Sequence, residues 1–239
     1  MTSLIIPVYN NEPTLQELNS RITKTFSDLR EDYEIFYVDD GSRDKSFEIL
    51  KAFSNKNSHI KIIKLMRNFG QSQAILAGFQ YAKGDVIVTL DADLQYNPED
   101  IPKLLKKIGD GFEIVCGWRK NRKDHFLSRK LPSYFANLFA RIKLQKNIKD
   151  IGCHFIALKR NITTQIKNYG HTARFLKPLL IKLSNNICEI DIEHHLRKKN
   201  KSQYGLAKLI KIALDFFINF SFKPIHKNTP LFIIEEVIG

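Results

Sequence analysis

Residues 85–95 read DVIVTLDADLQ, an aliphatic and β-branched run that ends in two aspartates one residue apart. The apolar part, Asp85–Leu90, predicts a buried strand. Asp91 and Asp93 follow it directly, so both carboxylates can reach one side of the loop beyond the strand. Two hard oxygen ligands suit Mg²⁺ or Mn²⁺, and Gln95 adds a third oxygen. A solvated turn can carry the same residues, but the strand before it favours a metal centre.

Segments of strand and helix character alternate on both sides of this stretch. Strands are predicted at Leu4–Val8, Tyr33–Val38, Ile60–Leu65, Phe112–Cys116, Cys153–Leu158 and Ile187–Ile192, and helices at Pro13–Leu29, Asp44–Phe53, Gln71–Ala82 and Pro98–Ile108. This alternation predicts an α/β fold with a mostly parallel sheet flanked by helices. We expect a catalytic domain over residues 1–205. Residues 206–239 are expected to form an amphipathic helix, Leu206–Phe220, and a tail that faces a membrane or a partner.

Polar segments follow the first, second and fourth predicted strands. Ligands of such sheets bind beyond the carboxyl ends of the strands, so we expect these segments to form the site. The second strand ends in Asp39-Asp40-Gly41-Ser42. A carboxylate here can accept hydrogen bonds from a nucleotide base or ribose. An ordinary Asp-Gly turn that caps the next helix is the alternative, and the shared sheet edge with Asp91 favours the nucleotide site.

Residues 119–149 hold ten Lys and Arg residues and one acid, Asp124. Arginines suit phosphate because the planar guanidinium matches its geometry. A solvated or membrane-facing surface has the same composition. We expect a few arginines to bind phosphate and most lysines not to. Asp150, at the end of the run, either forms an ion pair or acts at the reaction centre.

Composition narrows the class of protein. The 239 residues suffice for one sizeable domain, 43% are hydrophobic, and the net charge of +13 calls for a negatively charged partner. The chain lacks the interleaved basic and aromatic residues of RNA-binding surfaces, so we expect no nucleic acid partner. Three scattered cysteines favour a reducing cytoplasm over a disulfide framework. An apolar strand at Leu4 leaves no room for a signal peptide, and no stretch has the length of a membrane span.

Seven segments together resemble the inverting family-2 glycosyltransferases with a GT-A fold. Within that family the chain is similar to the polyprenyl-phosphate glycosyltransferases, the dolichyl-phosphate-mannose synthase group and its bacterial relatives. The segments are IPVYN (6–10), VDDGS (38–42), RNFGQ (67–71), TLDADLQ (89–95), GWR (117–119), DIGC (150–153) and KSQYG (201–205). Their shared order over almost the whole chain makes the resemblance specific.

The resemblance implies a role for each matching residue. The nucleotide-sugar pocket would comprise Pro7, Tyr9, Glu12, Asp39, Asp40, Asp91, Ala92 and Gln95. Asp91, Asp93 and Gln95 would hold the metal and the diphosphate, and Arg119, Arg129 and Ser133 the acceptor phosphate. Asp150, Asp93 and Arg119 would act at the reaction centre. A loop containing Arg197, Ser202 and Tyr204 would close over the donor.

The implied enzyme is a hexosyltransferase-type glycosyltransferase that uses Mg²⁺ or Mn²⁺ and a UDP- or GDP-linked sugar. Its acceptor would be an undecaprenyl- or dolichyl-type phosphate at the inner face of the cell membrane, where the protein would be peripheral on an anionic surface. A soluble or polysaccharide acceptor is the alternative. Many relatives continue into transmembrane helices. For this chain we expect that a separate membrane partner or a homo-oligomer can take part in the assembly.

Two positions depart from the family pattern, Asn11 in place of a common Glu and Gln203 in place of a common Lys. His194-His195 suggests a metal site. Adjacent strand residues point to opposite faces, however, so we expect both histidines to be structural.

Overall fold

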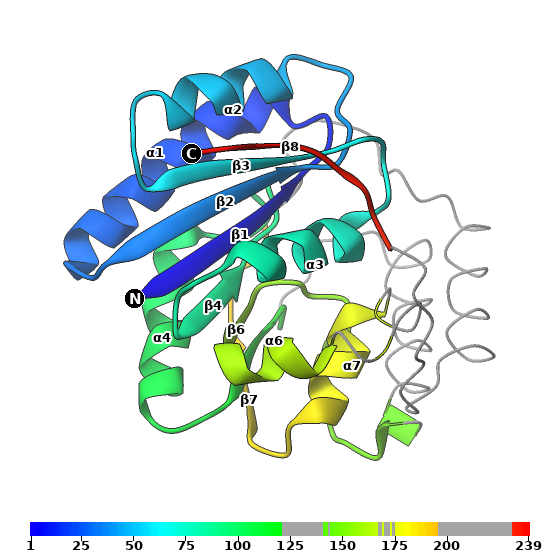
Figure 1. Cartoon of the computed structure of the whole chain (residues 1–239). Helices are drawn as coiled ribbons and strands as arrows, with labels where there is room; N and C mark the ends of the chain where they lie inside the picture. Colours follow the sequence, from blue (N-terminus) through cyan, green and yellow to red (C-terminus); the bar gives the residue numbers. More distant parts are fainter. Residues whose placement is uncertain (121–140, 143, 167–168, 170–172, 174, 196–230) are drawn as a thin grey trace.

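The computed structural model describes residues 1–120, 141–142, 144–166, 169, 173, 175–195 and 231–239. They build an eight-stranded sheet with helices on both faces (Figure 1). In sheet order the strands are β7 (Ile187–Asp191), β5 (Ile114–Trp118), β6 (Ile156–Lys159), β4 (Val86–Thr89), β1 (Thr2–Val8), β2 (Tyr33–Asp39), β3 (Ile60–Leu65) and β8 (Ile234–Ile238). The helices are α1 (Glu12–Leu29), α2 (Ser46–Ser54), α3 (Gln71–Tyr81), the 3₁₀ turn η1 (Pro98–Asp100), α4 (Ile101–Gly109), α6 (Arg160–Ile166) and α7 (Leu176–Leu183).

The sheet is mostly parallel, which confirms the predicted fold class. β1 pairs in parallel with β2 and β4, β2 with β3, and β5 with β7. β6 and β8 run antiparallel to their neighbours. The predicted elements that fall within the described residues are present, and their ends differ by at most three residues. One such difference is the start of β6, where the prediction began at Cys153 and the strand begins at Ile156.

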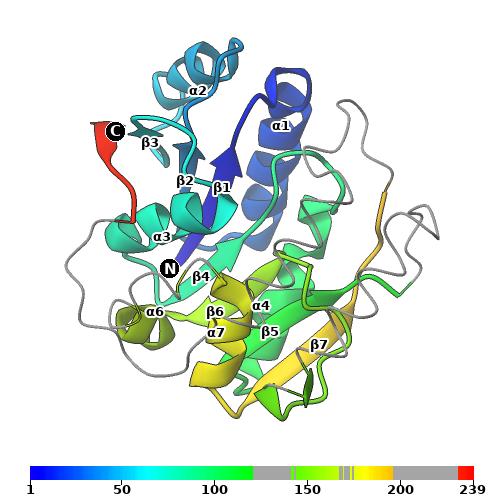
Figure 2. The same cartoon turned by 90° about the vertical axis from the view of Figure 1, so that its right-hand side faces the viewer.

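Alternation along β1 distributes the core between two layers. Leu4 and Ile6 pack with α1, α2 and α4 on one face, while Ile5 packs with α3, α6 and α7 on the other. A Cβ on Gly78 of α3 would lie 2.5 Å from Cγ2 of Ile5, so a glycine lets this helix approach the sheet closely. Helices of the two layers thus cover both faces of β1, β2 and β4 (Figure 2).

The end of the chain forms a strand that was not predicted. β8 pairs antiparallel with β3, and Glu235 forms an ion pair with Lys64 at 3.0 Å (Figure 1). Residues 206–230 lie outside the described residues, so the helix Leu206–Phe220 and the boundary at residue 205 stay predictions. No helix among the described residues is long and apolar enough to cross a membrane.

Candidate active site

The predicted polar segments meet at one edge of the sheet. β1 and β2 are in register with Val8 opposite Asp39, and β1 and β4 with Ile5 opposite Thr89. Their carboxyl ends therefore face the same way, and the loops beyond them are neighbours (Figure 2). The observed sheet topology therefore brings the predicted site segments to the same edge of the sheet.

Hydrogen bonds tie the loop after β1 to the loop after β2. The backbone N–H of Asn10 donates to Ser42 Oγ at 3.0 Å. The backbone N–H of Lys45 donates to Glu12 Oε2 at 3.2 Å. Asn10 adopts a φ of 54°, in the left-handed region that asparagine tolerates. Glu12, predicted to line the nucleotide pocket, therefore also joins the two loops.

Asp39 and Asp40 have different partners although they are adjacent. Asp39 is fully buried and accepts the backbone N–H of Ser42 at 3.3 Å, and burial raises the pKa of its carboxyl. Asp40 accepts the backbone N–H groups of Phe69 at 2.7 Å and Gly70 at 2.9 Å. Burial raises the pKa of Asp40 to about 6, against the effect of these two bonds. Asp40 thus holds the loop that leads into α3.

We expect Asp40→Asn to lower the free energy of unfolding by about 1–3 kcal/mol, because an amide can accept only one of the two backbone bonds. Since the pKa of Asp40 is raised to about 6 in the folded protein, protonation favours the folded state of the wild type. The difference from the variant should therefore widen as the pH falls from about 6 to about 4. Urea unfolding measures this, and hydrogen exchange should accelerate at the amides of Phe69 and Gly70.

The control is Asp32→Asn, which changes an exposed aspartate before the start of β2. It should alter stability by less than about 0.5 kcal/mol. Equal stability of Asp40→Asn and Asp32→Asn would show that Asp40 does not hold the loop.

The backbone of the loop after β4 is held in a strained shape. Ala92 accepts a hydrogen bond from Thr14 Oγ1 of α1 at 2.6 Å. Leu94, which is buried, adopts a φ of 58°, a conformation that costs a non-glycine residue about 1–2 kcal/mol. Such strain persists only where surrounding contacts enforce it, and it is concentrated at functional sites.

The three predicted metal ligands, Asp91, Asp93 and Gln95, all belong to this loop. Asp91 is half-buried, and its Oδ1 accepts a hydrogen bond from Gln71 Nε2 at the start of α3. Asp93 is buried, and its Oδ1 accepts the backbone N–H of Gln95 at 3.2 Å. Both carboxylates belong to one short turn, as their spacing predicts.

The donor set fits a divalent metal. Mg²⁺ in phosphate-binding sites is typically held by one or two carboxylates, with substrate oxygens and water completing the octahedron. Asp91 and Asp93 provide two such carboxylates, and the Gln95 side-chain oxygen is a further hard ligand. The described part of the chain contains no group of three or more His, Cys, Asp or Glu side chains placed to bind a metal.

A second centre is formed by Arg119, after β5, and Asp150, before β6. Arg119 Nε donates to Asp150 Oδ2 at 2.6 Å, and Arg119 Nη2 donates to Oδ1 at 2.8 Å. The backbone N–H groups of Arg119 and Gly152 also donate to this carboxylate, at 3.3 and 3.2 Å. Burial opposes the charge on Arg119, but the hydrogen bonds that it donates to Asp150, together with nearby negative groups, outweigh burial and raise the pKa of the guanidinium.

The backbone of Asp150 is fixed from two further elements. Lys177 of α7 is fully buried, and its Nζ donates to the Asp150 carbonyl at 2.5 Å. Glu189 of β7 accepts the backbone N–H of Asp150 at 3.3 Å. A charged group held this firmly can orient Arg119 without spending free energy on reorganisation.

Tyr96 directly follows Gln95 in the chain. It is buried, and its ring stacks on Phe155 with centroids 5.9 Å apart. Burial is the main cause that raises the pKa of its phenol, and the charges of Arg119, Asp91 and Asp150 also act on it. Asp91, a predicted metal ligand, and the pair of Arg119 and Asp150 therefore act on the same buried side chain.

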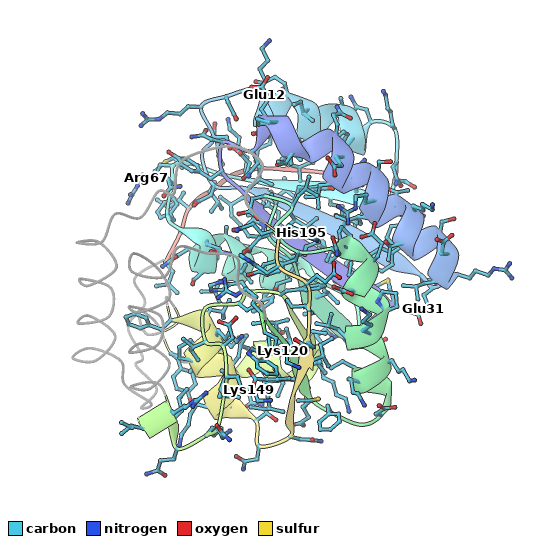
Figure 3. The ribbon with its side chains drawn as sticks, turned by 180° about the vertical axis from the view of Figure 1, so that it is seen from behind. Glu12, Glu31, Arg67, Lys120, Lys149 and His195 are labelled. Atoms are coloured by element: carbon cyan, nitrogen blue, oxygen red, sulfur yellow. The ribbon has the colours of Figure 1, made fainter. Side chains whose placement is uncertain are left out.

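Two lysines of the basic stretch pack on an aromatic ring. Lys149 Nζ lies 4.0 Å and Lys120 Nζ 5.9 Å from the centroid of Trp118 (Figure 3). Lys120 also pairs with Asp191 at 3.6 Å. The expectation that most lysines of the stretch do not bind phosphate stays a prediction.

Several predicted residues lie outside the described residues, namely Arg129, Ser133, Arg197, Ser202 and Tyr204. Their roles stay predictions. The nucleotide contacts of Pro7 and Tyr9 also stay predictions, and both residues are half-buried at the carboxyl end of β1. The structure adds Gln71, Lys177 and His194, which sequence reasoning gave no role in the site. The RNFGQ segment was the signal for Gln71, and a lysine on the otherwise apolar start of α7 was the signal for Lys177.

The sequence of this chain is similar to those of known glycosyltransferases. Residues 3–166 match the family described as Glycosyl transferase family 2. An undecaprenyl-phosphate 4-deoxy-4-formamido-L-arabinose transferase from Shewanella sediminis is 36% identical over 93% of this chain and 67% of its own length. The enzyme of the same name from Pectobacterium carotovorum is 38% identical over 93% of this chain and 68% of its own length.

Among solved structures, glucosyl-3-phosphoglycerate synthase from Mycobacterium tuberculosis is similar in fold. Its complex with Mn²⁺ and UDP-glucose has a TM-score of 0.68 and 15% identity, over 98% of this chain and 85% of that one. Its complex with Mn²⁺, UDP and phosphoglyceric acid has a TM-score of 0.65 and 18% identity, over 90% of this chain and 75% of that one. At these identities the similarity shows a shared GT-A-like fold.

Proposed function

The chain belongs to glycosyl transferase family 2, and from that premise we propose that it moves a sugar from a nucleotide-diphosphate sugar to a polyprenyl phosphate. That it is a glycosyltransferase follows from the family and from the transferases it resembles. The choice of acceptor rests on one observation, the 36–38% identity over 93% of the chain to transferases named for undecaprenyl phosphate.

We propose that the donor binds at the loops after β1, β2 and β4. Asp39, Asp40, Glu12, Pro7 and Tyr9 surround the proposed nucleotide pocket. Asp91, Asp93 and Gln95 are the proposed ligands of Mg²⁺ or Mn²⁺, which when bound neutralises the charge that develops on the leaving diphosphate. Structural neighbours that bind Mn²⁺ with UDP support this arrangement.

We propose that the acceptor phosphate binds beside Arg119, with Arg129 and Ser133 as further contacts. The second pKa of such a phosphate is near 6, so at neutral pH it is a dianion that needs to be positioned more than deprotonated. A phosphate oxygen bonds to the anomeric carbon as the bond from that carbon to the diphosphate breaks, and the electron pair leaves with the nucleoside diphosphate. In-line attack inverts the configuration.

All four acceptor positions of the Asp150 carboxylate are used by N–H donors of Arg119 and Gly152. This favours Asp150 as the group that orients Arg119 over Asp150 as a general base.

The test combines the protein with undecaprenyl phosphate, Mn²⁺ or Mg²⁺, and a panel of UDP- and GDP-linked hexoses, amino sugars and modified pentoses. Mass spectrometry should detect a glycosyl-phosphoryl lipid with at least one donor. Nucleotide-sugar binding without turnover for any donor would overturn the proposal. Turnover with a soluble phosphorylated or polysaccharide acceptor, and none with the lipid, would favour the alternative acceptor.

The proposed location is peripheral, on the inner face of the cell membrane, and the net charge of +13 suits an anionic surface. Flotation with vesicles that contain anionic lipid measures this. A protein that stays entirely in the aqueous fraction would contradict the membrane part of the proposal and leave the chemistry to be tested separately.

A further inference from the structure

The side-chain amide of Gln95 lies between two groups of the segment that follows β7. Gln95 Nε2 is 3.2 Å from Nε2 of His194 and 3.4 Å from the carbonyl oxygen of His195. The backbone N–H of His195 donates in return to the Gln95 carbonyl at 3.0 Å. The turn that carries Asp91 and Asp93 is thereby joined to a segment a hundred residues away in the sequence.

These contacts decide which end of the amide faces which way. A backbone carbonyl can only accept, so the amide nitrogen must face His195, and the amide oxygen must face away from it. His194 Nε2 strengthens this orientation when it accepts the second N–H of the same nitrogen. When Nε2 of His194 is the unprotonated nitrogen of the imidazole, two acceptors hold the nitrogen end of the amide, and the oxygen end faces the other way.

His194 is itself firmly placed. Its side chain is buried, and its ring packs against Tyr96 with centroids 6.1 Å apart. The segment before it is fixed to the end of β5 by the bond from the Ile192 N–H to the Trp118 carbonyl at 3.1 Å. By contrast, the imidazole of His195 is 42% exposed and points to Glu193 at 3.6 Å. His195 contacts Gln95 through its backbone carbonyl and its backbone N–H.

We propose that His194 is a positioning residue that turns the Gln95 oxygen toward the divalent metal held by Asp91 and Asp93. The inference rests on the proposed function, because it assumes a metal at that turn. Gln95 belongs to the same turn, since its backbone N–H donates to Asp93 Oδ1 at 3.2 Å. Partners behind a ligand that fix its orientation contribute 10- to 100-fold to metal affinity in other sites, by order of magnitude.

The test measures Mn²⁺ affinity by electron paramagnetic resonance with UDP present, so it needs no turnover. In His194→Phe, the ring still fills the space beside Tyr96 but cannot accept a hydrogen bond. We expect its Mn²⁺ affinity to fall roughly 10- to 100-fold. His194→Gln, whose amide oxygen can replace the imidazole acceptor, should recover most of that loss. UDP binding without metal should not change in either variant.

The matched control is His195→Ala, which removes the exposed imidazole and keeps the carbonyl, and its Mn²⁺ affinity should stay within about twofold of wild type. A double-variant cycle completes the test: once Gln95→Ala is present, His194→Phe should cause no further loss. Unchanged affinity in His194→Phe, or a full loss added to that of Gln95→Ala, would overturn the inference.

Failure of the proposed function gives different results. A wild type that binds Mn²⁺ with UDP but glycosylates no lipid would overturn the acceptor and leave the role of His194 intact. A wild type that binds no Mn²⁺ in the presence of UDP would overturn both the metal centre and this inference.

Discussion

Asp91→Asn and Asp93→Asn are each expected to lower kcat/KM by a factor on the order of 10³. A bound metal contributes several kcal/mol of charge stabilisation in the transition state, and each 1.36 kcal/mol corresponds to about a factor of ten. Each asparagine keeps an oxygen for the existing bond, from Gln71 to Asp91 and from the Gln95 backbone to Asp93. The substitutions therefore remove a charge while these two bonds can remain.

The measurement is initial-rate kinetics over a range of Mn²⁺ concentrations, together with thermal unfolding. We expect the midpoint of unfolding to change little and high Mn²⁺ to restore part of the activity, because a weakened metal site fills again by mass action. The control is Asp85→Asn at the opposite end of the same strand, where the carboxylate is 80% exposed. Activity within tenfold of wild type in both Asp91→Asn and Asp93→Asn would mean that these carboxylates do not hold a catalytic metal.

Local pattern predicted the strands of the central sheet because each is both apolar and followed by a polar turn. β4 and the Asp91 turn were visible for this reason. β8 was not predicted: its two adjacent glutamates, Glu235 and Glu236, break the alternation expected of a strand, and most of its residues are exposed. Its position depends on pairing with β3, about 170 residues earlier in the sequence, and on an ion pair with Lys64. Such a partner cannot be read from a local window.

The same limit applies to the site. Residue type and spacing predicted Asp91, Asp93 and the Arg119 region, because carboxylates after a strand and arginines in a basic run have a direct chemical meaning. The partner of each side chain depends on tertiary placement. His194 was expected to be structural on the grounds that it shares a strand with His195, yet both residues follow the end of β7 and the two contact Gln95 in different ways. Lys177 donates to the Asp150 carbonyl only because the fold places α7 beside the segment before β6.

The buried pair of Arg119 and Asp150 carries the second large expected effect. Asp150→Asn should lower kcat/KM for the acceptor by about 10²–10³-fold, because truncating one partner of a buried charge pair costs about 2–5 kcal/mol. KM for the donor should change by less than about threefold. Arg119→Lys should produce a similar loss, since an ammonium keeps the charge but cannot make the two parallel bonds. Lys120→Ala, which breaks an exposed pair with Asp191, is the control and should be nearly silent.

The pair also allows a decision between orientation and base catalysis. If Asp150 orients Arg119, the double variant Asp150→Asn/Arg119→Lys should be little worse than either single variant, because both act through one contact. The rate should still rise with pH through about 6, where the acceptor phosphate becomes a dianion, in the wild type and in Asp150→Asn alike. A general base would behave differently: its removal would change the pH dependence, and its effect would add to that of Arg119→Lys. Because four N–H donors already occupy the Asp150 carboxylate, we expect the first pattern.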